Sequence, residues 1–168
     1  MSQGELGPEH LEIYMQHKGI AGQMVYLDVP TPTVETAAAA VKAQPGQIVK
    51  SILFLVLGEP VLAISCGTSL IDRRAIARRF GTNRKQVKLA GSDEVIAIAG
   101  FPIGTVPPFG HRQQLTTLID KKVMEQDEVY AGGGGYNVLV KLKAADIPNY
   151  TEAEILELGL PKNQTKGD

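Results

Sequence analysis

The N-terminal part of the chain predicts a helix, a strand and a second helix. In residues 9–18 the apolar positions recur near helical spacing, and Gly19 follows as a stop signal. Residues 23–29 alternate in the manner of a strand, and two prolines then interrupt the pattern. Thr33 can cap an alanine-rich helix that runs to about Ala43.

The middle of the chain predicts a β-hairpin followed by a helix. Residues 48–57 and 61–65 are apolar and rich in β-branched side chains, and a Gly-Glu-Pro turn separates them. Asp72 can cap the next helix, and Gly81 stands where a helix end favours a left-handed residue. The apolar runs are long enough to form the centre of a sheet.

The C-terminal half mixes short strands with irregular segments. We expect a short helix, a loop rich in glycine and proline, three strands and a partly helical segment that Pro148 prevents from being continuous. These segments are residues 93–99, 100–111, 116–119, 129–131, 137–142 and 146–158. Because strands and helices alternate without a regular βαβ repeat, the pattern predicts an α+β or irregular α/β fold with a mixed sheet.

Length and composition predict one soluble domain. With 168 residues and 43% hydrophobic content, the chain can bury one full core, so we expect a single domain over residues 1–168 with a frayed polar tail at 161–168. No apolar run approaches the roughly 20 residues of a membrane helix. Residues 1–12 lack the pattern of a secretory signal, and a single cysteine fits a reducing compartment. We therefore expect a cytoplasmic protein without a membrane partner.

The charge is nearly balanced overall but uneven along the chain. A net charge of −1 excludes a protein that coats nucleic acid indiscriminately, because such binding neutralises many phosphates. Residues 72–88 nevertheless carry seven basic side chains against one acid. This segment can contact a phosphate backbone or can be a solvated helix face, and the sequence leaves both interpretations open. The candidate tRNA-binding residues are Arg73, Arg74, Arg78 and Arg79.

Several common kinds of site are absent from the sequence. No Cys-x-x-Cys pair or His-Glu-x-x-His motif occurs, and the three histidines lie in unrelated contexts, so we expect no metal. No phosphate-binding Gly-x-x-x-x-Gly-Lys motif occurs either, and we expect no cofactor. Cys66 follows an apolar strand and is typical of a small buried residue rather than a nucleophile.

Lys50 is the most informative candidate for chemistry. It stands near the start of a strand whose following residues are almost wholly apolar, which could hold its ammonium group at the rim of a partly desolvated pocket. The alternative is that the side chain simply extends from a strand end to solvent. Position alone favours the alternative.

Two glycine-containing segments add to this candidate site. Residues 104–110 combine prolines, which fix the backbone, with glycines that permit close approach of another group. Residues 132–135 are four consecutive glycines between two predicted strands, where bare amides could bind a carboxylate, a phosphate or an ester carbonyl. Ordinary turns are the alternative in both cases.

Together the segments 48–53, 104–110 and 129–134 resemble the YbaK/ProX-type aminoacyl-tRNA deacylases, which are relatives of the editing insertion domain of bacterial prolyl-tRNA synthetases. The resemblance covers about residues 21–158 in the right order and spacing. It implies a compact fold with a curved mixed sheet flanked by helices. It also implies hydrolysis of the ester that joins a wrong amino acid to the terminal adenosine of a tRNA.

The resemblance assigns roles to particular residues. Lys50 matches the most telling functional residue, and the glycine-containing loops match the segments that shape the substrate pocket. The expected substrate-binding residues are Gly104, Thr105, Val106, Pro107, Gly132, Gly133 and Gly134. Some relatives place a histidine near 132–137, whereas here only His111 follows the other loop, so a histidine base does not carry over.

The resulting hypothesis is a trans-acting deacylase. Its expected substrate is a tRNA, with tRNA-Pro as the carrier, mischarged with a small amino acid such as alanine, cysteine or serine. Its expected partners are the acceptor end of that tRNA and a synthetase such as prolyl-tRNA synthetase. Backbone amides of residues 104–106 or of the glycine run would stabilise the oxyanion, with a water or a ribose hydroxyl completing proton transfer. The rival hypothesis is a non-catalytic module that senses an amino acid or an aminoacyl-tRNA.

Overall fold

The computed structural model describes residues 4–161. Its α-helices are α1 (Pro8–Lys18), α2 (Val34–Val41), α3 (Arg73–Arg79), α4 (Ser92–Ala99) and α5 (Ile147–Thr151). The strands are β1 (Gly22–Tyr26), β2 (Val49–Val56), β3 (Glu59–Cys66), β4 (Ser69–Ile71), β5 (Val87–Leu89), β6 (Thr116–Asp120), β7 (Glu128–Gly132), β8 (Val138–Lys143), β9 (Glu154–Leu156) and β10 (Gly159–Pro161). Short 3₁₀ helices are η1 (Pro45–Gln47), η2 (Arg84–Gln86), η3 (Lys121–Glu125) and η4 (Ala144–Asp146).

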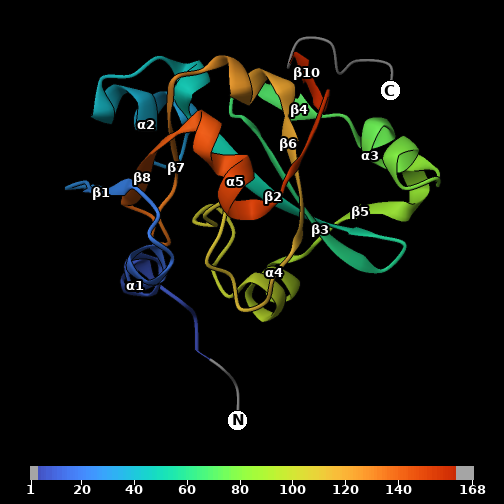
Figure 1. The fold of residues 1–168 in the computed structure, drawn as a ribbon, viewed down its shortest axis with the longest axis horizontal. Helices are drawn as coiled ribbons and strands as arrows, with labels where there is room; N and C mark the ends of the chain where they lie inside the picture. The colour runs from blue at the N-terminus through green and yellow to red at the C-terminus, as the bar shows by residue number, and fades with distance from the viewer. Residues whose placement is uncertain (1–3, 162–168) are drawn as a thin grey trace.

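A five-stranded mixed sheet crosses the centre of the molecule in the order β5-β2-β3-β6-β9 (Figure 1). The long hairpin of β2 and β3 is antiparallel and pairs along its full length. On the far side of β3, β6 and β9 run parallel to their neighbours. The hairpin is the most apolar part of the chain and occupies the middle of the sheet, where both faces can be buried.

Two smaller sheets complete the strand arrangement. One has the order β1-β8-β7, and an isolated bridge between Ile48 and Tyr130 brings its β7 edge beside the start of β2. The other pairs β10 with β4 near the C-terminal end of the described chain. The junction of β2 and β7 joins two segments that lie about 80 residues apart in the sequence, and the candidate site forms there.

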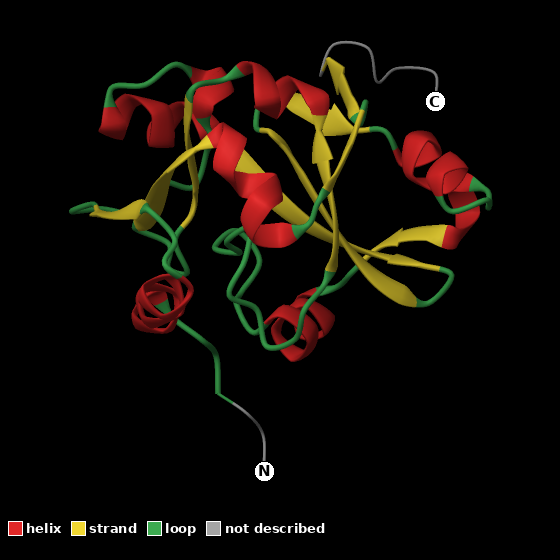
Figure 2. Cartoon of the chain, viewed as in Figure 1, coloured by secondary structure: helices red, strands yellow, loops and turns green. Residues whose placement is uncertain are grey.

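Three groups of buried side chains hold the elements together. The largest lies between α1, α4 and one face of the central sheet, with Leu11, Leu62 and Ile119 fully buried. A second lies under α3 on the opposite face. A third lies under α2 and joins Val34 to Leu139 of β8. Helices therefore cover the strands on several sides, with α3 at one end and α1 and α2 at the other (Figure 2).

Most of the expected elements are confirmed, with boundaries shifted by a few residues. The Thr33 side chain accepts a hydrogen bond from the Thr36 amide and so caps α2, and the Asp72 side chain caps α3 in the same way. The hairpin of β2 and β3 lies where the sequence predicts it. The mixed α/β architecture is thus the one that the sequence indicates.

Residues 146–158 are partly helical, as predicted, but Pro148 is not the residue that interrupts the helix. Pro148 lies at the start of α5, where its missing N–H costs nothing, and the helix ends at Thr151. The chain then forms β9, which pairs with β6. The strands β4, β5 and β10 have three residues each, too few for a recognisable period in the sequence. Most of the tail predicted to fray lies outside the described residues.

None of the helices within residues 4–161 is both long and apolar enough to cross a membrane.

Candidate active site

The first half of β2 forms a full strand ladder on one side only. β3 pairs with β2 over all of Val49–Val56, whereas β5, on the other side, pairs only with Phe54–Val56. Lys50 therefore lies on a part of β2 that β5 does not reach. Its side chain is exposed, while Val49 before it is buried. The strand thus places one long cation at the surface, beside an edge that a ligand can approach.

A cavity of about 630 Å³ lies beside this edge. Its walls come from the segment before α2, the first half of β2, the end of β5, α4, the 103–106 loop and the hairpin of β7 and β8. Its lining residues are Pro30, Thr31, Pro32, Thr33, Val34, Ala37, Ile48, Val49, Lys50, Ser51, Ile52, Leu53, Leu89, Ala90, Val95, Ile103, Gly104, Val106, Gly132, Tyr136 and Leu139. This volume is typical of pockets that bind small molecules.

The lining is predominantly apolar and carries one charge. Of the lining residues that belong to the described part of the chain, Lys50 alone has a charged side chain at neutral pH. No carboxylate within residues 4–161 forms an ion pair with it. The other polar side chains of the lining are hydroxyls, and that of Ser51 is buried without a hydrogen-bond partner. A single cation in an apolar wall favours a ligand with a negative or strongly polar group at one point.

The 103–106 loop is held rigidly against the glycine run. The Thr105 amide and hydroxyl both donate to the Pro102 carbonyl, at 3.0 and 2.8 Å. The Gly134 amide in turn donates to the Thr105 carbonyl, at 2.9 Å. Gly104 has a φ of +89°, a conformation that favours glycine. These contacts hold the loop at the cavity wall.

Gly132 allows the close packing of this loop. A Cβ atom at Gly132 would lie 2.6 Å from the Val106 carbonyl oxygen and 2.9 Å from that of Thr105. Backbone atoms cannot yield easily at such distances. The absence of a side chain at this position is therefore required for the 103–106 loop to lie where it does.

The backbone amides of Gly104 and Val106 have no hydrogen-bond partner within the part of the chain that the structure describes. Among the described residues, the N–H groups of Gly104 and Val106 donate to no acceptor, while those of Thr105, Gly133 and Gly134 are all hydrogen-bonded within the protein. Gly104 and Val106 both line the cavity. Of the amides that the sequence suggested for binding an oxyanion, those of Gly104 and Val106 are therefore available at the cavity, whereas those of Thr105, Gly133 and Gly134 are not.

The predicted substrate-binding residues therefore divide into two groups. Gly104, Val106 and Gly132 line the cavity together with Lys50. Thr105, Pro107, Gly133 and Gly134 are buried behind the lining. Gly134 has a φ of +92° and packs against residues 7 and 8, so it shapes the hairpin rather than the cavity surface.

His111 does not lie at this cavity. It lines a second cavity of about 590 Å³ with residues of α1 and α5, and its Nε2 lies 2.7 Å from the Pro107 carbonyl. Burial lowers the pKa of His111 to about 4, although the contact with Pro107 acts in the opposite direction. At neutral pH the ring is uncharged, and Nε2–H donates to that carbonyl. The structure thus provides no histidine base beside Lys50.

Cys66 and Asp120 do not line the cavity that contains Lys50 either. Cys66 is buried, as expected, and burial together with nearby Asp120 raises the pKa of its thiol to about 11, so it is no nucleophile at neutral pH. Asp120 could pair with Lys50 or cap the helix that follows it, but the structure shows neither contact. Its carboxylate is buried and accepts a hydrogen bond from the Leu158 amide at 2.9 Å.

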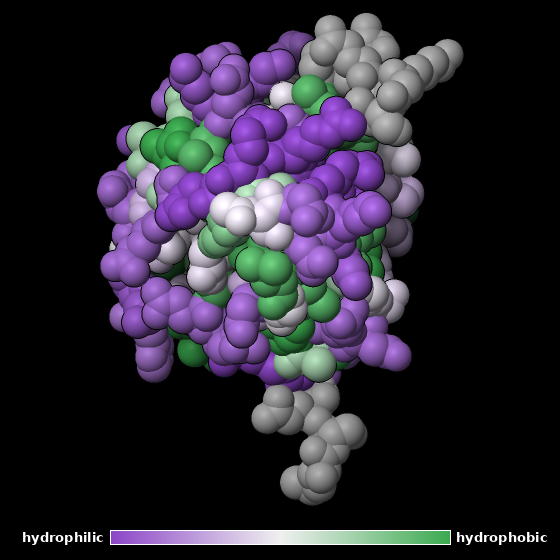
Figure 3. Space-filling model, turned by 90° about the vertical axis from the view of Figure 1, so that its right-hand side faces the viewer, coloured by the Kyte–Doolittle hydropathy of each residue, from purple (hydrophilic) through white to green (hydrophobic). Residues whose placement is uncertain are grey.

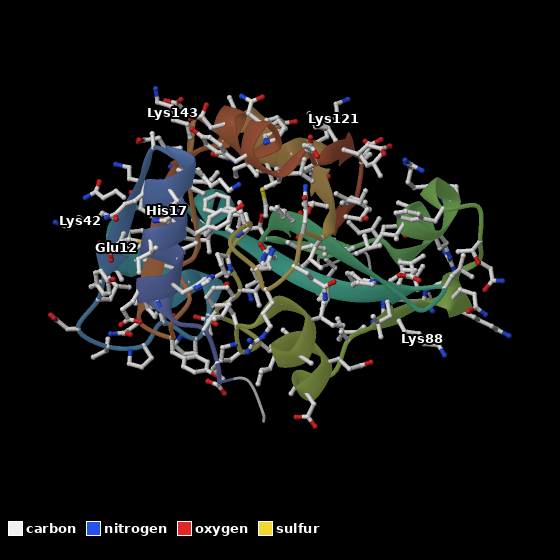
Figure 4. All side chains as sticks on the ribbon, turned by 60° about the horizontal axis from the view of Figure 1, so that its bottom comes forward. Glu12, His17, Lys42, Lys88, Lys121 and Lys143 are labelled. Atoms are coloured by element: carbon white, nitrogen blue, oxygen red, sulfur yellow. The ribbon has the colours of Figure 1, made fainter. Side chains whose placement is uncertain are left out.

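The basic segment lies at the other end of the molecule from α2. α3 and α2 are on opposite sides in Figure 1, and Lys88 is far from Lys42, the residue after α2, in Figure 4. Some of its cations have structural contacts: the Arg73 guanidinium lies over the Phe54 ring, and Arg79 pairs with Glu154 at 2.6 Å. The face that carries α3 is largely hydrophilic (Figure 3). None of the four candidate tRNA-binding arginines lines the cavity.

Much of the cavity lining could not be recognised from the sequence. Ser51 and Tyr136 carried no motif of their own, and residues 30–34 were interpreted only as a break and a helix cap. Their place at the cavity depends on long-range packing. Within residues 4–161, no group of three or more His, Cys, Asp and Glu side chains is arranged to hold a metal ion.

The protein is thus a small mixed α/β domain. It has an apolar cavity beside the central sheet, with one lysine in the lining, and this cavity is the candidate ligand site. Residues 28–150 match the family model described as the aminoacyl-tRNA editing domain. The match covers more than half of the chain. The protein therefore belongs to the aminoacyl-tRNA editing domain family.

Relatives support this assignment. A proline–tRNA ligase of Streptococcus equi subsp. equi is 27% identical over 117 residues, which are 67% of this chain but only 19% of the ligase. The chain thus corresponds to about a fifth of that enzyme. The uncharacterized protein YwhH of Bacillus subtilis is 24% identical over 129 residues, 76% of this chain and 80% of YwhH.

Solved structures share the fold. The crystal structure of a protein proposed to be a trans-editing enzyme for prolyl-tRNA synthetase has a TM-score of 0.85 and 29% identity, and covers 91% of this chain and 96% of that one. The crystal structure of a hypothetical protein has a TM-score of 0.83 at 24% identity, covering 90% and 99% of the two chains, and supports the fold alone. The predicted family and fold are confirmed.

Proposed function

We propose that the protein is a trans-acting deacylase that hydrolyses the ester of a mischarged tRNA in the cytoplasm. The observation that carries the proposal is the arrangement of Lys50 and the two unpaired amides of Gly104 and Val106 on one cavity. A cation and free N–H donors are the groups that stabilise negative charge on an ester oxygen. The family and the similarity to a protein proposed to edit in trans support the same function.

In the proposed reaction, water adds to the ester carbonyl and the carbonyl oxygen becomes an oxyanion. The amides of Gly104 and Val106 donate to this oxyanion, each contributing about 3–4 kcal/mol of transition-state stabilisation when well aligned. The tetrahedral intermediate then breaks the bond to the ribose oxygen, which receives a proton that originates from the water. The products are the free amino acid and the uncharged tRNA.

The cavity offers no side chain as a general base. Among the described residues that line it, none is a histidine, an aspartate or a glutamate. We therefore assign the proton transfer to the neighbouring ribose hydroxyl or to a bound water, held close to the reacting atoms by the cavity. Lys50 orients the substrate or stabilises its negative charge. In this mechanism the protein accelerates the reaction by positioning the substrate and by stabilising negative charge.

The proposed substrate is tRNA-Pro carrying a small amino acid such as alanine, cysteine or serine. The relation to proline–tRNA ligases supports this carrier and prolyl-tRNA synthetase as a partner. The apolar walls around Val34, Ala37 and Ile48 suit a short side chain with few polar atoms. Among the three, we expect alanine and cysteine to be removed faster than serine, whose hydroxyl would have to be desolvated.

The test is release of the amino acid from tRNA-Pro charged in turn with alanine, cysteine, serine and proline. We expect release by the wild type, and a rate on the order of 100-fold lower for Lys50→Ala because charge stabilisation is removed. Lys121→Ala is the matched control, since Lys121 is also exposed but does not line the cavity. Equal rates for wild type and Lys50→Ala would contradict the assigned role of the lysine.

The missing side-chain base also favours a second candidate, a non-catalytic module that senses an amino acid or an aminoacyl-tRNA. The same experiment separates the two functions. Stoichiometric binding of a charged tRNA without release of the amino acid would support the sensing module and reject the deacylase.

A further inference from the structure

Tyr136 is an exposed aromatic ring at the mouth of the cavity. It follows the glycine run in the hairpin between β7 and β8, and 61% of its surface is exposed although it lines the cavity. Among the described residues, neither its ring nor its hydroxyl forms a ring contact or a hydrogen bond with the protein. The ring is therefore available to a ligand.

The backbone that carries this ring is held by hydrogen bonds at Tyr136 itself and at the next residue. The Tyr136 carbonyl accepts a hydrogen bond from the Thr31 amide at 3.2 Å. The next residue, Asn137, binds Leu27 twice: its carbonyl accepts from the Leu27 amide at 2.8 Å, and its side-chain amide donates to the Leu27 carbonyl at 3.0 Å. An exposed ring on an anchored backbone loses little conformational freedom when it binds a flat partner.

Other apolar side chains at the mouth are exposed as well. Ile103 and Leu89 line the cavity and are 50% and 55% exposed. The residues that line its interior, such as Val34, Ile48 and Val95, are almost completely buried. The cavity thus has an enclosed interior that suits a small group and an apolar rim that suits a larger one remaining in contact with solvent.

In an aminoacyl-tRNA, the terminal adenine is a larger group that could lie on this apolar rim. The amino acid and the terminal adenine are attached to the same ribose, so an ester held near Gly104 and Val106 leaves the adenine within one sugar of the cavity. Flat, unpaired bases bind exposed aromatic rings by stacking, with little dependence on sequence. We propose that Tyr136 stacks on the terminal adenine and so positions the ester for hydrolysis.

This inference rests on the proposed function for the placement of the ester, but it can be measured without catalysis. The chain contains no tryptophan, so Tyr136→Trp introduces a single fluorescent reporter at the mouth. The control is Tyr26→Trp. Tyr26 is 56% exposed but does not line the cavity, and its hydroxyl donates to Glu12 of α1. Both variants are titrated with the uncharged trinucleotide CCA and with the same trinucleotide lacking its terminal base.

We expect CCA to quench the tryptophan at position 136 in a saturable manner, with little change at position 26. Removal of the terminal base should weaken binding by roughly 5- to 150-fold, the range for one base stacked on one aromatic ring. Equal quenching at both positions, no quenching at position 136, or no effect of removing the base would each overturn the proposal.

A kinetic measurement tests the positioning role. With a charged tRNA that the wild type hydrolyses, Tyr136→Ala should raise KM, while Tyr136→Phe should keep it near the wild-type value because the ring remains. Thermal unfolding of both variants excludes loss of fold as the cause. If the wild type releases no amino acid, the deacylase fails and the fluorescence titration still decides the stacking. If the wild type is active and Tyr136→Ala leaves KM unchanged, the stacking role fails alone.

Discussion

At the scale of single residues, the site depends as much on a missing side chain as on Lys50. In the proposed reaction Lys50 acts together with the free amides of the 103–106 loop, which line the same cavity. The position of this loop requires the close approach of the Thr105 and Val106 carbonyls to Gly132. The glycine run is therefore explained mainly by packing. Of its four residues Gly132 lines the cavity, and the buried Gly133 and Gly134 shape the hairpin.

Gly132→Ala is expected to displace the loop. The new methyl group would overlap backbone atoms at 2.6 Å, and overpacking of this kind costs about 1–3 kcal/mol of stability. Denaturant unfolding should show this loss, and deacylation should fall further than stability alone explains because the amides of Gly104 and Val106 move. Gly46→Ala is the control, since its methyl group would meet only a flexible side chain at 3.4 Å. Full activity of Gly132→Ala would contradict this account.

At the scale of the elements, the start of α2 forms one wall of the cavity. Thr33 and Thr36 form a capping box, in which each side chain accepts a hydrogen bond from the other residue's backbone amide. The helix has only eight residues, so its own hydrogen bonds hold it weakly. The cap therefore helps to keep Val34 and Ala37 in place against the cavity.

Thr33→Ala should cost about 1 kcal/mol of stability, the usual value for removal of an N-cap. We also expect a higher KM for the charged tRNA, because the wall that carries Val34 becomes less well ordered. Chemical denaturation and steady-state deacylation measure the two effects. Thr68→Ala, at a threonine outside the cavity, should change neither. A variant at Thr33 with unchanged stability would mean that the cap is not needed to hold α2.

At the scale of the whole molecule, the basic segment and the cavity are separated. In the proposed function the cavity holds only the charged end of a tRNA, so the rest of the tRNA would extend across the surface. We propose that the face around α3 contacts its phosphates, and that the whole chain acts as one editing domain. Arg78 and Lys85 are both exposed on this face. Because this face is separated from the cavity, we expect Arg78 and Lys85 to affect the binding of a full-length tRNA but not that of a short substrate.

The double variant Arg78→Ala, Lys85→Ala should bind full-length charged tRNA less tightly. The slope of its salt dependence should fall by about one unit for each phosphate that the variant no longer neutralises. Hydrolysis of a charged CCA trinucleotide should be unaffected, because that substrate does not reach α3. Affinity measured over a series of salt concentrations provides the test. An equal loss for both substrates, or no loss for either, would reject the proposed phosphate-binding face.

The sequence by itself determined the local elements and the family. The hairpin of β2 and β3, the caps at Thr33 and Asp72, and the mixed fold follow from patterns that neighbouring residues create, and the three glycine- and lysine-containing segments carry the resemblance. Only the tertiary structure decided which of these residues share a cavity. Long-range packing at the junction of β2 and β7 placed Tyr136 and Ser51 at the first cavity and His111 at the second. Among the described residues it left the amides of Gly104 and Val106 free, while those of Thr105, Gly133 and Gly134 are hydrogen-bonded. The lining of a cavity and the free amides within it depend on hydrogen bonds and packing between residues that are far apart in the sequence, so no local pattern predicts them.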